Sequence, residues 1–533
     1  MRIVATLLAT VAMAVALPSH AADKAARPQP AKHSDEPGNA ADATPSGSIA
    51  GPDKSETAQA SATEYSVSRH RSIPFRGATL NYTVTPGTLT IRNDEGEPIA
   101  SMFYTAYVLD APKGGKPRPI TFLYNGGPGS SSMWLHMGSY GPLKVDVPGF
   151  DTLHGEPGHL VPNQDTILDR TDMVFLDAIG TGLSRPLGKA TGKDFWSVDG
   201  DLDAFARGIQ RYLTLNNRWA SPKFLLGESY GTTRTGGLTY VLQQRGVQLA
   251  GATIMSTVLD IPLLFDPSVD QMHVNVFPTF ATTAWYHNRI ANKPADLDAF
   301  AKEAQAFATG PYAAALAKGD RLTPEERNQV AQQAAALIGV SPEFLLRNNL
   351  RPGPDRFRKE LLRDQRRTVG RLDSRFDGID ADAGGEGPEF DAANEAISGA
   401  FIAAINNYLF NDLGYQTKLT YRPNFYSGIG PAWDWKHKAP GNARQFAANT
   451  SVDLSQAMRQ NPKMKLLSLN GYYDMATPFA GADYDLEHME LDPALKANIT
   501  YKYYPSGHMI YIEPGSAARL RQDIDAFYDS ITR

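Results

Sequence analysis

The chain has 533 residues, a formal net charge of −5 at pH 7 and no cysteine. Its length allows one large domain with an insertion, or two domains, each with ample interior. The lack of cysteine excludes disulfides, thiolate metal sites and a cysteine nucleophile, and the weakly acidic balance gives no reason to expect a nucleic-acid partner.

The first 21 residues have the composition of a secretory signal peptide. Arg2 is followed by the apolar run Ile3–Leu17 and then by Ser19-His20-Ala21, whose small residues suit a signal peptidase. A transmembrane anchor is the less favoured alternative, because the run is shorter than the roughly 20 residues that a span needs. We therefore expect export, to the periplasm or outside the cell, without stable membrane insertion. Residues 22–63 have almost no large apolar side chain and predict a disordered linker.

The residues from 64 to 260 predict the first part of an α/β core. Period-two runs on either side of Thr85-Pro86-Gly87 predict a hairpin. Six short apolar runs then predict buried strands, separated by helical stretches: Ile120–Tyr124, Met173–Leu176, Phe224–Leu226, Ala252–Met255, Lys465–Leu469 and Ile499–Tyr504. This alternation indicates a mostly parallel sheet covered by helices on both faces, with functional loops at the carboxyl ends of its strands.

A glycine-rich loop, Asn125-Gly126-Gly127-Pro128-Gly129-Ser130-Ser131-Ser132, directly follows the first of these strands. Such a loop can present bare backbone amides to an anion. The phosphate-loop interpretation fails, because the loop lacks the Gly-Lys-Ser/Thr ending. An oxyanion hole fits better, with the amide of Gly127 as one donor.

The stretch Gly227-Glu228-Ser229-Tyr230-Gly231 lies between the apolar run Phe224–Leu226 and a helical segment. A serine at such a strand-to-helix turn has an exposed hydroxyl, and the helix N-terminus behind it favours developing negative charge. The motif is common by chance, but its strand and helix context supports a nucleophile elbow. Ser229 is then the nucleophile, and the amide of Tyr230 is the second oxyanion donor.

Residues 261–424 interrupt this rhythm and predict a helical cap insertion. Thr323-Pro324-Glu325-Glu326 is a capping box, and Ser341-Pro342 begins a further helix. Four aspartates in this region could suggest calcium, but Gly384 occupies the fifth position of an EF-hand loop, so a solvated acidic loop is favoured: Asp373, Asp377, Asp380 and Asp382. We expect no metal and no cofactor.

The segment from 425 to 533 predicts the second part of the core and supplies the remaining chemistry. Asp474 follows the strand Lys465–Leu469, and His508 follows the strand Ile499–Tyr504. The chain order Ser, Asp, His is the order that α/β-hydrolases use. His508 would remove the proton of Ser229, and Asp474 would orient the imidazole, with Asp483 and Asp485 as rival acids. A final amphipathic helix contains Leu520, Ile524, Phe527 and Ile531.

Taken together, these motifs resemble those of the serine carboxypeptidase family, of the carboxypeptidase Y and cathepsin A type. The resemblance covers about Ile120 to Met509 and rests on the glycine-rich loop, Tyr140-Gly141-Pro142, the 177–184 stretch Asp-Ala-Ile-Gly-Thr-Gly-Leu-Ser, Gly-Glu-Ser-Tyr-Gly and Gly-His-Met. It implies an α/β-hydrolase fold with an inserted cap in an exported, bacterial-like member. It further implies that Asn125 and Glu228 anchor the substrate carboxylate.

Three departures from the family pattern concern the same region. Leu123 stands where a tryptophan is usual, Ser130 where a cysteine is usual, and Ser139 where a glutamate usually pairs with the one before the serine. Without that pair we expect the pKa of Glu228 not to be raised, so an ionised Glu228 would repel the substrate carboxylate. Arg185, just after the Gly180-Thr181-Gly182 turn, is a candidate compensating cation; a surface arginine is an equally good interpretation.

The predicted function is therefore an exported serine peptidase that removes C-terminal residues from a peptide substrate through an acyl-enzyme on Ser229. An esterase or acyltransferase with the same triad is the alternative, since the cap decides which acceptor resolves the acyl-enzyme. A binding protein on a retired hydrolase scaffold is disfavoured by the intact triad. The sequence does not determine the oligomeric state.

Overall fold

The computed structural model describes residues 60–110, 115–147 and 157–532. The predicted signal peptide and most of the predicted linker lie outside these residues. Residues 60–63, which were assigned to the end of the linker, are described, and the carbonyl of Ala62 accepts a hydrogen bond from the Thr90 hydroxyl at 2.6 Å. The described part of the chain therefore includes the last residues of the predicted linker.

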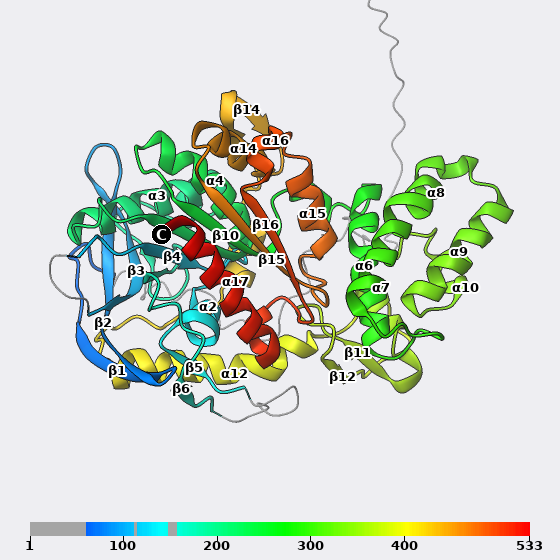
Figure 1. The fold of residues 1–533 in the computed structure, drawn as a ribbon, viewed down its shortest axis with the longest axis horizontal. Helices are drawn as coiled ribbons and strands as arrows, with labels where there is room; N and C mark the ends of the chain where they lie inside the picture. The colour runs from blue at the N-terminus through cyan, green and yellow to red at the C-terminus, as the bar shows by residue number, and fades with distance from the viewer. Residues whose placement is uncertain (1–59, 111–114, 148–156, 533) are drawn as a thin grey trace, which may run out of the picture. The chain divides into compact units, whose positions relative to one another are not determined.

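A ten-stranded mixed sheet forms the centre of the described residues, in the order β1-β2-β3-β7-β4-β9-β10-β15-β16, with β8 paired to β3 (Figure 1). The pairs from β1 to β3 are antiparallel, and those from β7 to β16 are parallel. The fold is that of an α/β-hydrolase, as predicted. The strands are β1 Arg69–Phe75, β2 Ala78–Arg92, β3 Pro98–Leu109, β4 Ile120–Tyr124, β7 Asp172–Leu176, β8 Arg185–Pro186, β9 Lys223–Ser229, β10 Gly251–Thr257, β15 Lys465–Gly471 and β16 Ile499–Tyr504.

The predicted hairpin turn at residues 85–87 is wrong. Strand β2 continues through Pro86 and Gly87, which pair with Thr105 and Tyr104 of β3. Gly87 permits a close approach rather than a turn, because a Cβ there would lie 2.8 Å from both the Cβ of Ser66 and the Tyr104 hydroxyl. A proline and a glycine together usually indicate a turn, but here they mark the place where the N-terminal segment crosses the strand.

Both faces of the parallel strands are buried by helices, which explains their continuous apolar runs. On β4, Leu123 packs with the core beneath α2, α12 and α17, whereas Phe122 and Tyr124 pack with the core beneath α3, α4 and α14. In Figure 1, α17 crosses in front of the sheet. These helices are α2 Met133–Leu135, α3 Val198–Leu215, α4 Tyr230–Gln244, α12 Ala392–Asn407, α14 Ser451–Gln460, α15 Phe479–Glu487, α16 Pro493–Lys496 and α17 Pro514–Thr532.

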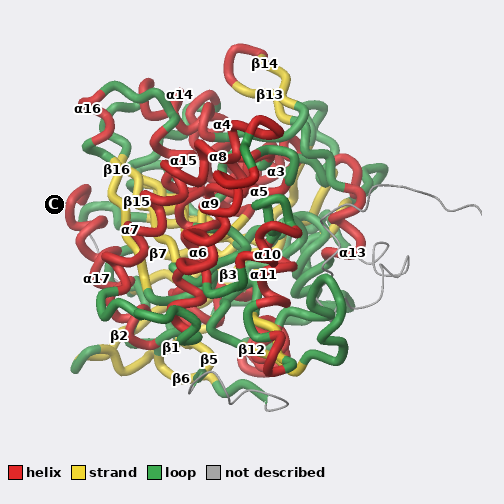
Figure 2. The backbone as a smooth tube through the Cα atoms, turned by 90° about the vertical axis from the view of Figure 1, so that its right-hand side faces the viewer, coloured by secondary structure: helices red, strands yellow, loops and turns green. Residues whose placement is uncertain are grey.

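The predicted insertion divides between two hydrophobic cores. Residues from Val274 to Val369 form a core of their own with Met475, whereas α12 packs on the core beneath the sheet. Thr323 and Glu326 form the predicted capping box, and Ser341 caps α10. Figure 2 shows α6, α9 and α10 in front of the strands. The helices of this part are α5 Pro262–Phe265, α6 Asp270–Tyr286, α7 Leu297–Phe307, α8 Ala313–Lys318, α9 Pro324–Ile338, α10 Pro342–Arg347 and α11 Pro354–Glu360.

Short elements complete the described chain. Three small hairpins lie outside the main sheet: β5 Leu143–Val145 with β6 Leu160–Pro162, β11 Arg367–Val369 with β12 Asp377–Ile379, and β13 His437–Ala439 with β14 Ala443–Gln445. Helix α13 spans Tyr426–Ile429, and single helical turns include η1 His136–Tyr140 and η9 Ile510–Ile512. Two of these turns, α13 and η9, place side chains beside the carboxyl ends of the parallel strands, where the candidate site lies.

Candidate active site

The serine of the elbow lies where β9 ends and α4 begins. Ser229 has φ 62° and ψ −135°, a strained conformation for a non-glycine residue that recurs at functional sites. The elbow needs glycine around it, because a Cβ at Gly227 would lie 2.1 Å from the carbonyl oxygen of Gly231. The local sequence therefore permits the tight strand-to-helix turn that exposes the hydroxyl.

Asp474 and His508 meet after the last two parallel strands of the sheet, β15 and β16. The Nδ1 atom of His508 donates to Oδ2 of Asp474 at 2.7 Å. Asp474 is wholly buried, and its Oδ1 accepts the amides of Ala476 and Thr477 at 2.8 and 2.9 Å. These bonds hold the carboxylate in the orientation that fixes the imidazole with Nε2 available as a base.

The charge around His508 favours its protonated form. Burial lowers the pKa of the imidazole, but the Asp474 carboxylate and the charge of Glu228 raise it, so that the net pKa lies above the ordinary value. The rival acids are occupied elsewhere: Asp483 accepts the Tyr503 hydroxyl at 2.6 Å, and Asp485 accepts the amide of Leu259 at 2.8 Å. Asp474 is therefore the acid that the fold brings to the histidine.

The glycine-rich loop after β4 lies directly against the elbow. A Cβ at Gly126 would lie 2.5 Å from the amide nitrogen of Tyr230, so only glycine permits this approach. Gly127 has φ 106°, a conformation that glycine adopts without strain. The backbone after β4 and the first amide of α4 thus lie side by side, an arrangement that the predicted oxyanion hole requires.

Two buried charged side chains, Arg234 and Asp177, hold the two ends of the glycine-rich loop. The Arg234 guanidinium donates to the carbonyl of Asn125 at 2.7 Å and pairs with the Asp201 carboxylate at 2.7 Å. At the other end, Oδ1 of Asp177 accepts both the amide and the hydroxyl of Ser132 at 2.8 Å. Arg234 and Asp201 had no predicted role. They lie in two different helices, α4 and α3, so no local motif identifies the pair.

The side chains of Asn125 and Glu228 meet beside the nucleophile. Asn125 Nδ2 donates to Glu228 Oε1 at 2.9 Å, while Asn125 Oδ1 accepts the amide of Leu135 at 3.0 Å, which sets the orientation of the carboxamide. Glu228 is only 2% exposed, and its Oε2 has no hydrogen-bond partner of normal geometry among the described residues. A buried polar atom without a partner is a group poised for a ligand.

The expectation that Ser139 leaves the pKa of Glu228 unraised is wrong. Burial raises the pKa of Glu228 to about 7 against the opposing influence of His508, and the charge of the Asp474 carboxylate adds to the rise. The Ser139 hydroxyl donates to the carbonyl of Leu135 at 2.6 Å instead. Removal from water alone disfavours the charged form of a carboxyl group, and the sequence pattern could not reveal how completely this one is enclosed.

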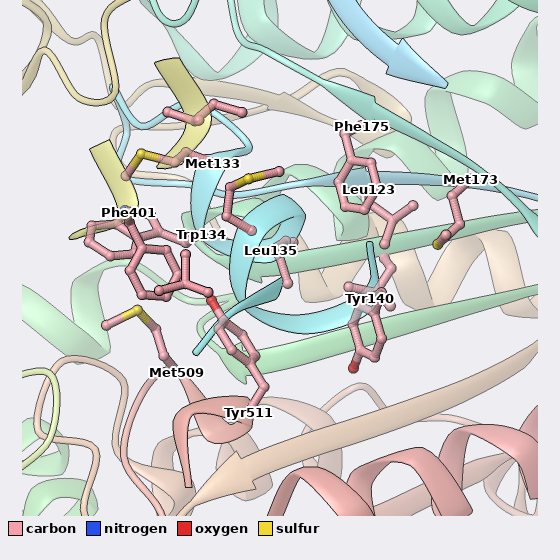
Figure 3. Packing of buried hydrophobic residues seen from close by; sticks show 14 of the residues in the cluster. Leu123, Met133, Trp134, Leu135, Tyr140, Met173, Phe175, Phe401, Met509 and Tyr511 are labelled. Atoms are coloured by element: carbon pink, nitrogen blue, oxygen red, sulfur yellow. The ribbon is translucent and has the colours of Figure 1, made fainter. Parts of the chain in front are cut away.

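Tyr511 was not predicted and lies next to this pair. It belongs to η9, three residues after His508, and Figure 3 shows its ring directed toward α2. The approach depends on Gly138, because a Cβ there would lie 2.6 Å from the ring. Burial and then the charge of Glu228 raise the pKa of Tyr511 well above its ordinary value, so the hydroxyl stays protonated beside the carboxyl group.

Arg185 is not directed at Glu228. The side chain is fully buried, and its guanidinium donates to the carbonyls of Gly182 and Ser184 at 3.0 Å and of Thr420 at 2.8 Å. These bonds tie the loop after β7 to the segment that precedes α13. Arg185 is therefore neither a surface arginine nor placed as the predicted compensating cation.

The four aspartates considered for calcium serve the local structure instead. Three of them pair with cations: Asp373 with Arg375, Asp377 with Arg367 and Asp380 with Lys359. Asp382 accepts the amide of Gly384 at 2.9 Å in a turn. Within the described ranges, no group of three or more metal-ligating side chains is arranged to hold a metal ion.

Comparison with known families gives one match. The sequence model of the serine carboxypeptidase family matches residues 79–310, a span that includes the glycine-rich loop and the elbow. Comparison with curated proteins found no match.

Comparison with solved structures found similar chains, of which the first shares the fold. A prohormone-processing carboxypeptidase from Saccharomyces cerevisiae, Kex1(delta)p, is 14% identical with a TM-score of 0.51, over 84% of this chain and 92% of that one. A proline iminopeptidase from Mycobacterium smegmatis is 13% identical with a TM-score of 0.34, over 83% and 99% of the two chains. A carboxyl esterase from Bacillus coagulans is 11% identical with a TM-score of 0.32, over 83% and 98%.

Proposed function

We propose, from the family match over residues 79–310, that this chain acts as a serine carboxypeptidase and releases the C-terminal residue of a peptide through an acyl-enzyme on Ser229. In this mechanism, His508 takes the proton of the Ser229 hydroxyl as the hydroxyl attacks the scissile carbonyl, and returns it to the leaving amine. Asp474 keeps the imidazole in the required tautomer. The amides of Gly127 and Tyr230 stabilise the oxyanion, and water then hydrolyses the ester.

The observation that carries the exopeptidase assignment is the enclosed pair of Asn125 and Glu228 directly beside the nucleophile. The pair hydrogen-bonds at 2.9 Å, and burial holds the pKa of Glu228 at about 7. Below that pH the protonated carboxyl group can donate to a substrate carboxylate, while a carboxamide N–H supplies a further donor. A peptide whose C-terminal carboxylate lies here presents its last peptide bond to Ser229.

Digestion of a peptide library, with mass-spectrometric reading of which end shortens, tests this proposal. Stepwise loss from the C-terminus supports it, and the matching C-terminal amides should be poor substrates at mildly acidic pH. Cleavage of simple esters without loss of C-terminal residues would instead establish the esterase or acyltransferase alternative. Failure of Ser229 to react with a serine-directed organophosphonate would contradict every enzymatic assignment.

We also propose that the protein is an exported, bacterial-like member of its family. The support is the charged, apolar and small-residue order of residues 1–21, which lie outside the described part of the chain. Across the residues that are described, no helix is both long and apolar enough to cross a membrane. N-terminal sequencing of exported material should find a start near Ala22, and recovery of uncut Met1 in the membrane fraction would contradict the proposal.

A further inference from the structure

Arg371 lies in a segment that is fastened to both triad loops. Its carbonyl accepts the amide of Met475 at 3.1 Å, and the carbonyl of Leu372 accepts the amide of His508 at 2.6 Å. On the other side, the two carboxylate oxygens of Asp391 accept the amides of Arg371 and Leu372 at 2.9 and 3.1 Å. The position of Arg371 relative to the catalytic groups is therefore set by the backbone.

Arg371 is partly buried as a residue, and its guanidinium has no ion-pair or hydrogen-bond partner among the residues that the structure describes. Neighbouring arginines of the same region do have such partners: Arg375 pairs with Asp373 at 2.6 Å, and Arg358 with Asp355 at 2.8 Å. An arginine without a counter-ion beside the triad loops is available to bind an anionic ligand.

The charge of Arg371 acts on the catalytic space. It lowers the pKa of the His508 imidazole, which the Asp474 carboxylate raises. It also lowers the pKa of the Tyr426 hydroxyl, which the charge of Glu228 raises. The Tyr426 ring stands against the oxyanion loop, because a Cβ at Gly127 would lie 2.8 Å from it. The charges of Arg371 and Glu228 thus both act on one residue that contacts the glycine-rich loop.

We propose that the Arg371 guanidinium binds the C-terminal carboxylate of the peptide substrate, together with the pair of Asn125 and Glu228. The inference rests on the proposed function and adds a cation to the substrate site, a role that Arg185 does not fill because it donates to backbone carbonyls. Guanidinium and carboxylate match geometrically in bidentate pairs, which fixes the terminal residue as well as neutralising it. The cation also offsets the repulsion between the substrate carboxylate and the Asp474 carboxylate.

The test compares Arg371→Ala with the parent enzyme on an N-blocked dipeptide as the free acid and as the amide. Loss of a charged hydrogen-bond pair should lower kcat/KM on the acid roughly tenfold to a hundredfold and leave the amide within about threefold. Arg371→Lys should restore part of the difference, because lysine keeps the charge without the planar fork. Arg356→Ala is the matched control, since this exposed arginine pairs with Glu386 at 2.8 Å and should change neither substrate.

Three results would overturn the assignment: an equal loss on acid and amide, an unchanged acid preference, or a loss confined to substrates with an acidic side chain at the C-terminus. Circular dichroism and thermal unfolding establish that each variant folds, and Arg371→Gln replaces the alanine variant if it does not. The proposed function fails separately, when the parent enzyme itself shows no preference for the acid. If the parent enzyme prefers the acid and Arg371→Ala keeps that preference, only the role of Arg371 is refuted.

Discussion

Replacing Glu228 by glutamine separates the protonated from the ionised carboxyl group without changing its size. The glutamine keeps an oxygen for Asn125 Nδ2, which donates to Glu228 Oε1 at 2.9 Å, and presents an N–H where the protonated acid has an O–H. It cannot ionise at any working pH. The variant therefore isolates the effect of protonation at this position from every other titration in the site.

The magnitude follows from burial, which raises the pKa of Glu228 to about 7. The protonated fraction then falls from about nine tenths at pH 6 to about one tenth at pH 8, so the acid-to-amide ratio of kcat/KM should fall about tenfold over that range. Titration of His508 affects both substrates alike and cancels in the ratio. In Glu228→Gln the ratio should stay flat.

The same shift makes a prediction about stability. The pKa of Glu228 rises on folding from 4.5 to about 7, so the folded state loses stability as the pH rises through this window. The loss amounts to at most about 3 kcal/mol once the group is ionised, and glutamine does not incur it. Urea unfolding should find Glu228→Gln more stable than the parent at pH 8 and close to it at pH 4.

The assay measures initial rates on an N-blocked dipeptide acid and its amide at half-unit steps from pH 5.5 to 8.5. A ratio that falls with the same midpoint in Glu228→Gln would assign the titration to another group and refute this account. A ratio that is flat in both proteins would show that Glu228 does not contact the substrate carboxylate. Glu487 is an exposed residue at the end of α15, and its replacement by glutamine should leave the pH dependence of the acid-to-amide ratio unchanged.

Further predictions concern the triad and the buried arginine. Ser229→Ala should lower turnover roughly 10^4-fold or more without loss of folding, and retention of a tenth of the activity would contradict the nucleophile assignment. Asp474→Asn should lower kcat roughly 10^3 to 10^4-fold with a small change in KM, because the imidazole loses its orienting acceptor; steady-state kinetics on an ester substrate checks this. Arg185→Met should lower the free energy of unfolding by about 3 kcal/mol or more, because three carbonyls lose a charged donor. Urea titration measures this change. A loss of kcat/KM on free-acid substrates alone would instead place Arg185 in the substrate site.

Local sequence patterns were sufficient for the parts of the site that depend on short stretches of chain. The elbow needs glycines at 227 and 231 because backbone atoms occupy the space of a side chain, and such a requirement is visible in a motif. Asp474 and His508 could be found because each directly follows an apolar strand, and parallel strands bring their carboxyl ends to one edge.

The remaining features depend on contacts between distant segments, which no local pattern encodes. The pKa of Glu228 depends on its complete enclosure, to which Tyr511 contributes from the other end of the chain. Pro86 and Gly87 suggest a turn by composition, but the pairing with β3 and the crossing of Ser66 keep the strand continuous. Arg371 carries no motif at all, and only its backbone bonds to the triad loops reveal its place.

Those bonds also bear on how a peptide can enter. Because the amide of His508 donates to Leu372 and that of Met475 to Arg371, the start of the segment after β11 is bonded to the loops of both His508 and Asp474. Movement of this segment would break the two hydrogen bonds, so we expect both to stay closed while a peptide enters. The amides of His508 and Met475 should then exchange hydrogen as slowly as those of the central strands. A protease cut that frees this segment should abolish turnover even though Ser229, Asp474 and His508 remain chemically intact.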